Sequence, residues 1–157
     1  MPDQEPGDLV FVLSEVEHET FTRAGSDLTA PLEITLAESL CGFSRVVLKH
    51  LDGRGIHINH PRGHVLKPSQ VLKVPGEGMP IKKSETKGDL YLVVDVAFPD
   101  DGWLKGDDDA TVAKLQGLLP KPRGPILADT VDEVEYEADA NLEEVSFHLK
   151  KGLSKRR

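Results

Sequence analysis

The stretch GDLYLVVDVAFP, residues Gly88–Pro99, has the clearest structural pattern in this sequence. Apolar side chains stand at every second position, and in a strand they would all lie on one face. They are Leu90, Leu92, Val94, Val96 and Phe98. The positions between them are mixed in character, as expected for a strand with one face on a core and the other partly wet. The stretch predicts a mainly β fold.

The Gly-Asp-Leu opening of that stretch occurs twice. GDLVFVL at residues 7–13 matches GDLYLVV at residues 88–94, and the two copies are 88 − 7 = 81 residues apart. A repeated strand at this spacing predicts that each copy closes one of two successive units. We therefore expect the last strand of a preceding β domain within residues 1–17 and one complete copy of that domain in residues 18–100. The chain is expected to be a fragment of a longer protein.

Several short motifs, taken in order, resemble the carboxy-terminal half of DnaJ-type co-chaperones. They lie in HETFTRAGSDL, in Leu51-Asp52-Gly53, in the later Gly-Met-Pro and Gly-Asp-Leu triplets and in Phe98-Pro99. The residues expected to have a structural role in these motifs are His18, Phe21, Arg23, Gly25, Asp27, Leu28, Gly78, Met79, Pro80, Gly88, Asp89 and Leu90. The sequence is nearest to type I (class A), the class that carries a zinc-binding cysteine-rich region. The resemblance implies that family's second β-sandwich-like substrate domain, with short helices, followed by a dimerisation segment.

Parts of the family's full pattern are absent from the sequence. It has no His-Pro-Asp loop of a J domain, no run of CxxC pairs and no terminal prenylation box. By resemblance, zinc belongs to the missing cysteine-rich region, and stimulation of the seventy-kilodalton heat-shock chaperone belongs to the missing J domain. We therefore expect no cofactor in this chain and no stimulation of a chaperone ATPase by the chain alone.

Charge and cysteine content limit the possible partners. The 19 Lys and Arg residues against 27 Asp and Glu give a formal net charge of −8, so no positive field attracts phosphate backbones. Cys41 is the single cysteine, which excludes an internal disulfide framework and suits a reducing compartment. No apolar run approaches a membrane span. We expect no nucleic-acid partner, no membrane span and a cytoplasmic location.

The sequence offers little for metal binding or catalysis. His57, His60 and His64 form the only cluster that resembles a metal site, but Pro61 and Gly63 predict an irregular loop that would not hold three imidazoles in a tetrahedral array. No Ser-His-Asp order, phosphate loop or paired acid in a general-base setting is visible. We expect no metal and no enzymatic activity.

Other segments of the β unit carry weaker signals. Asp52-Gly53 lies between two apolar runs and predicts a hairpin. The strands expected in addition to residues 90–98 are 28–35, 45–51, 55–59 and the late part of 65–74. Residues 36–41 predict one or two helical turns with Leu36, Leu40 and Cys41 on the core and Gly42 as the end.

Residues 101–120 predict a dimerisation helix. Apolar residues recur at helical spacing over residues 110–119, acidic residues precede this run, and Pro120 ends it. Three prolines then make a stiff connector, PKPRGP, ahead of a tail in residues 121–157. The apolar residues expected to form the dimer are Val112, Leu115, Leu118, Leu119, Ile126, Leu127, Val131 and Val134.

Two conformations of the tail agree with its sequence. Thr130 and Glu133 fit a capping box, and apolar residues from Val131 to Leu149 continue at helical spacing. The family resemblance instead implies an extended chain over the first part. We favour an extended tail to about Tyr136 and a marginal helix after it.

These patterns favour a homodimerising, client-supporting region of a co-chaperone that delivers unfolded polypeptides to the seventy-kilodalton heat-shock chaperone. An apolar helix and an apolar-studded tail each need a partner surface, which a second copy supplies. The alternative is an autonomous module that holds client peptide in an apolar groove or at a strand edge, with incidental dimerisation.

Overall fold

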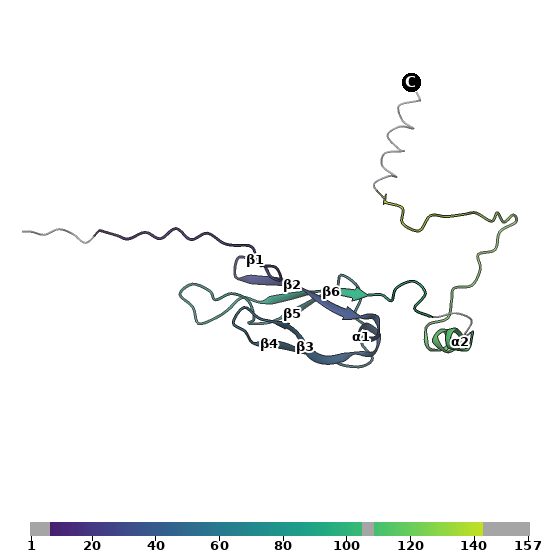
Figure 1. Ribbon diagram of the computed structural model, residues 1–157, viewed down its shortest axis with the longest axis horizontal. Coiled ribbons are helices and arrows are strands. Elements are labelled where there is room, and N and C mark those ends of the chain that lie inside the picture. The colour runs from purple at the N-terminus through teal and green to yellow at the C-terminus, as the bar shows by residue number, and fades with distance from the viewer. Residues whose placement is uncertain (1–6, 105–108, 143–157) are drawn as a thin grey trace, which may run out of the picture. The chain divides into compact units, whose positions relative to one another are not determined.

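The computed structural model describes residues 7–104 and 109–142. The chain divides into two units, Met1–Asp107 and Asp108–Arg157. The described part of the first unit is mainly β, with two sheets and one short helix, as the sequence predicted (Figure 1). Within the described residues, no helix has both the length and the apolar character needed to cross a membrane.

The larger sheet of the first unit has four strands in the order β1-β2-β6-β5. Their bounds are β1 Thr22–Ala24, β2 Asp27–Thr35, β5 Val71–Val74 and β6 Leu90–Ala97. β1 and β2 form a hairpin and β5 pairs antiparallel with β6, whereas β2 and β6 run parallel. The predicted strand at residues 90–98 is therefore an inner strand of this sheet.

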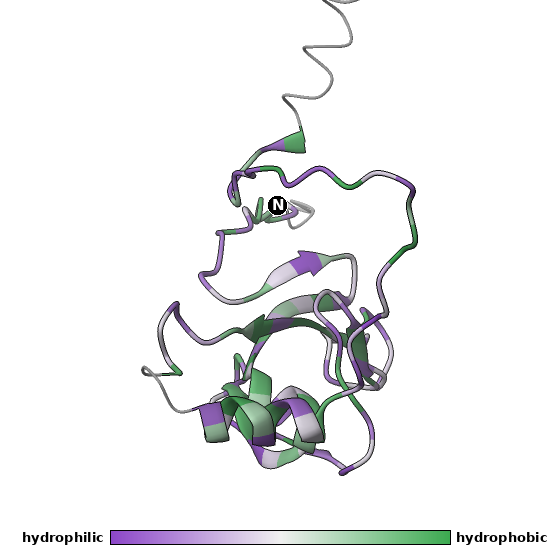
Figure 2. Ribbon diagram, turned by 90° about the vertical axis from the view of Figure 1, so that its right-hand side faces the viewer, coloured by the Kyte–Doolittle hydropathy of each residue, from purple (hydrophilic) through white to green (hydrophobic). Residues whose placement is uncertain are grey.

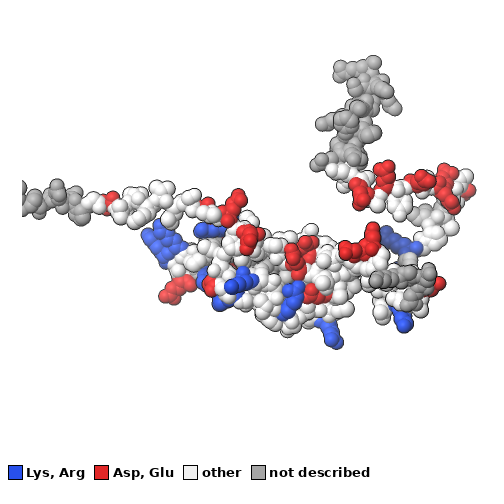
Figure 3. All heavy atoms as spheres, in the orientation of Figure 1, with Lys and Arg blue, Asp and Glu red and all other residues white. Residues whose placement is uncertain are grey.

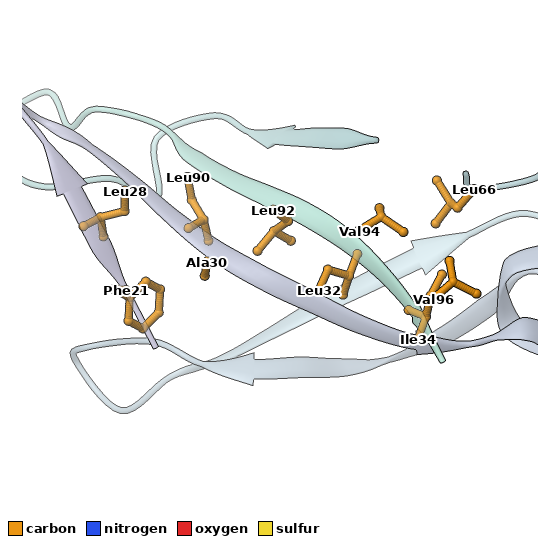
Figure 4. Packing of buried hydrophobic residues seen from close by; sticks show 10 residues of the cluster. All are labelled: Phe21, Leu28, Ala30, Leu32, Ile34, Leu66, Leu90, Leu92, Val94 and Val96. Carbon is orange, nitrogen blue, oxygen red and sulfur yellow. The ribbon is translucent and has the colours of Figure 1, made fainter. Parts of the chain in front are cut away.

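The parallel pair β2 and β6 supplies most of the core. Leu28 pairs with Leu90, and the pairing continues in register as far as Thr35 and Ala97. Because both strands alternate in phase, their apolar residues fall on the same face. The buried cluster consists of Phe21, Leu28, Ala30, Leu32, Ile34, Leu66, Leu90, Leu92, Val94 and Val96 (Figure 4). Phe21 and Leu66 lie at opposite ends of it in this view.

A two-stranded sheet forms the second layer. β3, Phe43–Lys49, pairs antiparallel with β4, Gly55–His60, as the Asp52-Gly53 turn predicted. Phe43, Val47, Leu48 and Ile58 of this hairpin are partly buried against the core. The result is the sandwich-like arrangement of two layers seen in Figure 1.

Helix α1, Leu36–Cys41, joins β2 to β3. Thr35 caps it in a capping box with Glu38, whose carboxylate also binds Arg45 at 2.6 Å. This hydrogen bond to Arg45 is the main reason that the pKa of Glu38 is lowered. The expected inward face was wrong at two positions, because Leu40 and Cys41 are exposed and Ser39 is buried.

The first predicted strand does not form within the described chain, and the strand predicted at residues 90–98 ends one residue early. Residues 8–16 form no strand and run outside any sheet, with Leu9 to Leu13 exposed. A strand needs a neighbour for its N–H and C=O groups, and this segment has none among the described residues. Phe98 is also exposed, because β2 and β6 stop pairing at Thr35 and Ala97, one residue before it.

The second unit contains helix α2, Asp109–Leu118, close to the predicted helix at 110–119. Residues 119–141 then run without helix or strand, as expected for an extended tail to Tyr136. The marginal helix predicted after Tyr136 falls mainly on residues 143–157, which lie outside the described residues. Hydrophobic and hydrophilic residues are interleaved along the tail (Figure 2).

Candidate functional site

The family-type motifs meet at one end of the four-stranded sheet. The turn between β1 and β2 contains Gly25, whose positive φ of 62° suits glycine. Next to this turn, the Met79 N–H donates to the carbonyl of Ser26 at 2.7 Å. The Gly78 N–H donates to the carbonyl of Gly88 at 2.8 Å, and the Gly88 N–H donates to the carbonyl of Met79 at 2.9 Å. We call Ser26, Asp27, Gly78, Met79, Gly88 and Asp89 the motif cluster.

Two glycines of the motif cluster are required by space rather than by backbone angle. Neither Gly78 nor Gly88 is among the residues with positive φ. A Cβ on Gly78 would lie 2.6 Å from the backbone nitrogen of Asp89, and a Cβ on Gly88 would overlap the carbonyl oxygen of Ser26. The two triplets therefore carry glycine because three backbone segments touch there.

Two aspartates fasten the start of β6 to the motif cluster. The Asp89 N–H donates to Oδ1 of Asp27 at 2.8 Å, and the Leu28 N–H donates to the carbonyl of Asp89 at 2.9 Å. The carboxylate of Asp89 accepts from the Gly76 N–H at 3.0 Å and binds Lys73 Nζ at 2.9 Å. The hydrogen bond from Gly76 and then the one from Lys73 lower the pKa of Asp89.

We expect the Asp89 carboxylate to make folding sensitive to acid. Its folded-state pKa is lowered, so its contribution is present above the unfolded-state pKa of about 3.9 and is lost as the pH falls through the folded-state value. Urea unfolding should show a smaller drop in the free energy of unfolding at acidic pH for Asp89→Asn than for the parent chain. Asp95→Asn, at an exposed position of β6, is the matched control. An equal acid response of parent and Asp89→Asn would contradict this role.

A pocket of about 550 Å³ opens beside the motif cluster. Its apolar lining comes from segments that are distant in sequence: Val16, Phe21, Leu28, Leu51 and Met79. Glu15, Glu17, His18, Thr22 and Arg23 add polar groups. A concave apolar surface with polar groups among its lining residues suits an apolar side chain of a peptide.

His18 and Arg23 hold the segment that forms one side of the pocket. Nδ1 of His18 accepts from the Thr20 N–H at 3.0 Å and from the Phe21 N–H at 3.3 Å. Nε of Arg23 donates to the carbonyl of Gly25 at 2.8 Å, and the same guanidinium lies 3.6 Å from Glu15. Both side chains thus tie the link before β1 in place.

A charged network joins the β3–β4 turn to the segment before Met79. Arg54 binds Asp52 at 2.6 Å and Glu77 at 2.7 Å. The guanidinium lowers the pKa of both carboxyl groups, and the two carboxylates raise the pKa of Arg54. Sequence patterns did not identify Leu51 as part of the pocket wall or Glu77 as a partner of Arg54. Arg54 and Glu77 are 23 positions apart in the chain, and no local signal marks their contact.

The three histidines considered as metal ligands have other contacts. Nε2 of His57 lies 3.3 Å from Oγ of Ser44, and Nε2 of His60 lies 2.8 Å from the carbonyl of His64. Among residues 7–104 and 109–142, no group of three His, Cys, Asp or Glu side chains is arranged to hold a metal ion.

The predicted dimerisation residues lie in the second unit. No residue of α2 is buried, and Leu115 is the least exposed of its apolar side chains. Leu118 is 85% exposed, and Ile126 and Leu127 are each 94% exposed. Val112, Leu119, Val131 and Val134 are exposed too. Asp and Glu side chains gather along the same tail (Figure 3).

Comparison with known proteins gives matches over most of the chain. The family model "DnaJ C terminal domain" matches residues 1–99. DnaJ homolog subfamily A member 2 of Homo sapiens is 44% identical over 138 residues, covering 87% of this chain and 32% of that protein. DnaJ protein homolog xdj1 of Schizosaccharomyces pombe is 44% identical over 128 residues, or 80% and 30% of the two chains. Chaperone protein dnaJ 3 of Arabidopsis thaliana is 42% identical over 147 residues, or 91% and 34%. The chain spans about one third of the length of these relatives.

Proposed function

The chain belongs to the DnaJ C-terminal domain family of heat-shock co-chaperones, and from this membership we propose that it is the homodimerising, client-supporting region of a type I co-chaperone. In the full-length protein, two such regions hold two client-binding arms together. The partners of that protein are unfolded polypeptides and the seventy-kilodalton heat-shock chaperone. The work is done in the cytoplasm and needs no cofactor or metal within this region.

The exposed apolar surface of the second unit is the observation that supports dimerisation. Leu118, Ile126 and Leu127 each leave most of their side chain in water. Burying one such side chain yields about 1.5–3 kcal/mol. Because several of them are exposed on one helix and one tail, burying them together against a partner would be strongly favourable. A second copy of the same unit supplies a matching apolar surface.

Two-fold symmetry strengthens the case for a second copy as the partner. In such a dimer each subunit contributes the same surface patch, so each apolar residue of the patch is buried in both subunits. A standard interface buries about 800 Å² per partner, which a helix and tail of this length can provide. The acidic tail residues stay at the rim, where charge is tolerated.

The test is sedimentation of the chain across concentration. We expect Leu118→Asp to weaken the dimer by about a hundredfold, because it removes an apolar contact and places a carboxylate in the interface. Gln116→Asp, which adds the same charge at an exposed polar position of α2, is the matched control and should remain dimeric. Both variants should keep the circular dichroism of the β unit. A dimer of unchanged strength in Leu118→Asp would show that the interface lies elsewhere.

The pocket beside the motif cluster favours a second function, direct binding of client peptide. Its apolar lining accepts one large apolar side chain, and the pocket lies wholly within the first unit. Deleting the residues after Pro125 separates the two functions. If the tail forms the dimer interface, the deletion should abolish the dimer. If the pocket binds client peptide, the deletion should leave binding of a leucine-containing peptide intact.

A further inference from the structure

His50 is a buried histidine that no function above employs. It follows β3, immediately before Leu51 of the pocket wall. Its side chain is buried, and its ring packs against Phe21, also of the pocket wall, with a centroid distance of 5.5 Å. A buried ring between two wall residues is placed to influence the pocket.

Two hydrogen bonds fix the protonation state of this ring. The Leu51 N–H donates to Nδ1 at 2.8 Å, which requires a free lone pair on that nitrogen. Nε2 lies 2.8 Å from the carbonyl oxygen of Glu77, and that pair requires a hydrogen on Nε2. Both bonds form only when the imidazole is neutral with its proton on Nε2.

Two carboxylates lie near the two ring nitrogens. Asp52, in the β3–β4 turn, has Oδ1 3.9 Å from Nδ1, and Glu77, in the segment before Met79, has Oε2 3.8 Å from Nε2. Arg54 is bound to both carboxylates and opposes their pull on a positive ring. His18 contacts the Phe21 ring at 5.5 Å, and Lys87 acts on Glu77 electrostatically. A proton on Nδ1 would face a backbone donor at Leu51 and an acceptor at Asp52.

We propose that His50 is a proton-sensitive latch on the pocket: the neutral ring holds Leu51 in the wall, and protonation releases the Leu51 amide and turns the ring toward Asp52. The proton comes from solvent and binds the lone pair of Nδ1. One backbone hydrogen bond is lost and one charge-assisted hydrogen bond to a carboxylate is gained.

The pocket responds because the ring touches or adjoins three parts of its wall. Leu51 is the next residue and loses the bond that orients its backbone. Phe21 packs on the ring itself. The carbonyl of Glu77, which accepts from Nε2, lies two residues before Met79. A turn of the ring therefore acts on wall residues from three separate segments.

The test follows the ring nitrogens and the Leu51 amide by NMR in the whole chain, from about pH 8 to about pH 5, the range in which histidines titrate. At the upper end we expect the nitrogen pattern of the Nε2–H tautomer for His50. On acidification the Leu51 amide should shift with the same midpoint as the His50 ring. The titration of His57, an exposed ring on β4, should leave the Leu51 amide unmoved. An Nδ1–H tautomer, or a Leu51 amide that ignores the His50 titration, would overturn the latch.

Two substitutions separate the two nitrogens. In His50→Asn the amide oxygen stands in for Nδ1, so the Leu51 amide should keep its neutral-state shift at every pH. In His50→Gln the amide nitrogen stands in for Nε2 and Leu51 has no acceptor, so its amide should show the acidic shift at every pH. A pH-dependent Leu51 amide in both variants would contradict the proposal. If either variant does not fold, the NMR titration of the wild-type chain tests the proposal by itself.

A peptide experiment extends the result to the pocket and rests on the peptide-binding function proposed above. A fluorescent peptide with one leucine among polar residues should bind more weakly at about pH 5 than at about pH 8, and His50→Asn should remove that difference. Absence of peptide binding at every pH would contradict the peptide function, whereas the NMR titration would still test the latch. Binding that weakens equally in the parent and in His50→Asn would overturn the link between latch and pocket.

Discussion

Gly88→Ala should prevent the chain from folding or lower its free energy of unfolding by more than about 4 kcal/mol. A Cβ at this position would overlap the carbonyl oxygen of Ser26 and lie 2.8 Å from Oδ1 of Asp27. Neither neighbour can move freely. The Ser26 carbonyl accepts the Met79 N–H, and Asp27 accepts the Asp89 N–H that starts β6. The methyl group would therefore separate the three segments of the motif cluster.

Gly7→Ala is the matched control for this experiment. Gly7 opens the other Gly-Asp-Leu copy, and nothing lies within 4 Å of the Cβ that the substitution would add. Urea unfolding followed by circular dichroism should give the parent's midpoint for Gly7→Ala and an early or absent transition for Gly88→Ala. Equal behaviour of the two variants would contradict the crowding at Gly88. Both glycines open a Gly-Asp-Leu triplet, so a difference between the two variants would come from the structural surroundings of Gly88.

The same pair of motifs shows how far a pattern predicts a strand. Alternation in residues 88–98 predicted β6 and its buried face, because inward and outward positions can be read from the segment itself. The repeated Gly-Asp-Leu entry into the apolar run of residues 7–13 predicted a strand that is absent from the described chain. The apolar pattern of a segment indicates which of its side chains would be buried if it formed a strand. Whether the strand forms depends on a neighbouring strand, which the segment's own sequence does not specify. Its assignment to a preceding domain remains a prediction.

The pairing partners of strands that lie far apart in the chain could not be predicted from the sequence either. The Asp52-Gly53 turn identified the β3–β4 hairpin because its partners adjoin it in the chain. The parallel pairing of β2 with β6 joins residues about 60 positions apart, for example Leu28 with Leu90 (90 − 28 = 62), and no local signal marks it. The pocket was missed for the same reason, since its wall is assembled from Phe21, Leu51 and Met79. The family resemblance identified Phe21, Leu51 and Met79 as motif residues but gave no contact among them.

Helix α1 shows a limit of a different kind. Apolar residues were expected on its inner face, yet Ser39 is buried and Leu40 and Cys41 are exposed. The reason is a partner outside the helix, because the hydroxyl of Ser39 donates to the carbonyl of Leu66 at 2.6 Å. A buried polar group with such a partner costs little, whereas the same group without one costs about 1–3 kcal/mol. The partner lies 27 residues away, on a loop without strand or helix.

Leu66→Ala should lower the free energy of unfolding by about 2–5 kcal/mol, the range for a large-to-small change in a core. Leu66 is 1% exposed and completes the buried cluster, although it lies outside any strand. Its N–H donates to the carbonyl of Ser39 at 3.1 Å, and its carbonyl accepts from the Ser39 hydroxyl. These two hydrogen bonds hold the main chain of Leu66 in place. The lost side chain should therefore leave a cavity rather than a collapsed loop.

The neighbouring residue provides the control for Leu66. Val65 is 51% exposed, and Val65→Ala should change the free energy of unfolding by less than about 0.5 kcal/mol. Urea titrations of both variants, with equal denaturant slopes, give the comparison directly. A loop that merely covered the surface would make the two substitutions equally mild. A large loss confined to Leu66→Ala would establish that this irregular segment is anchored in the core by one side chain.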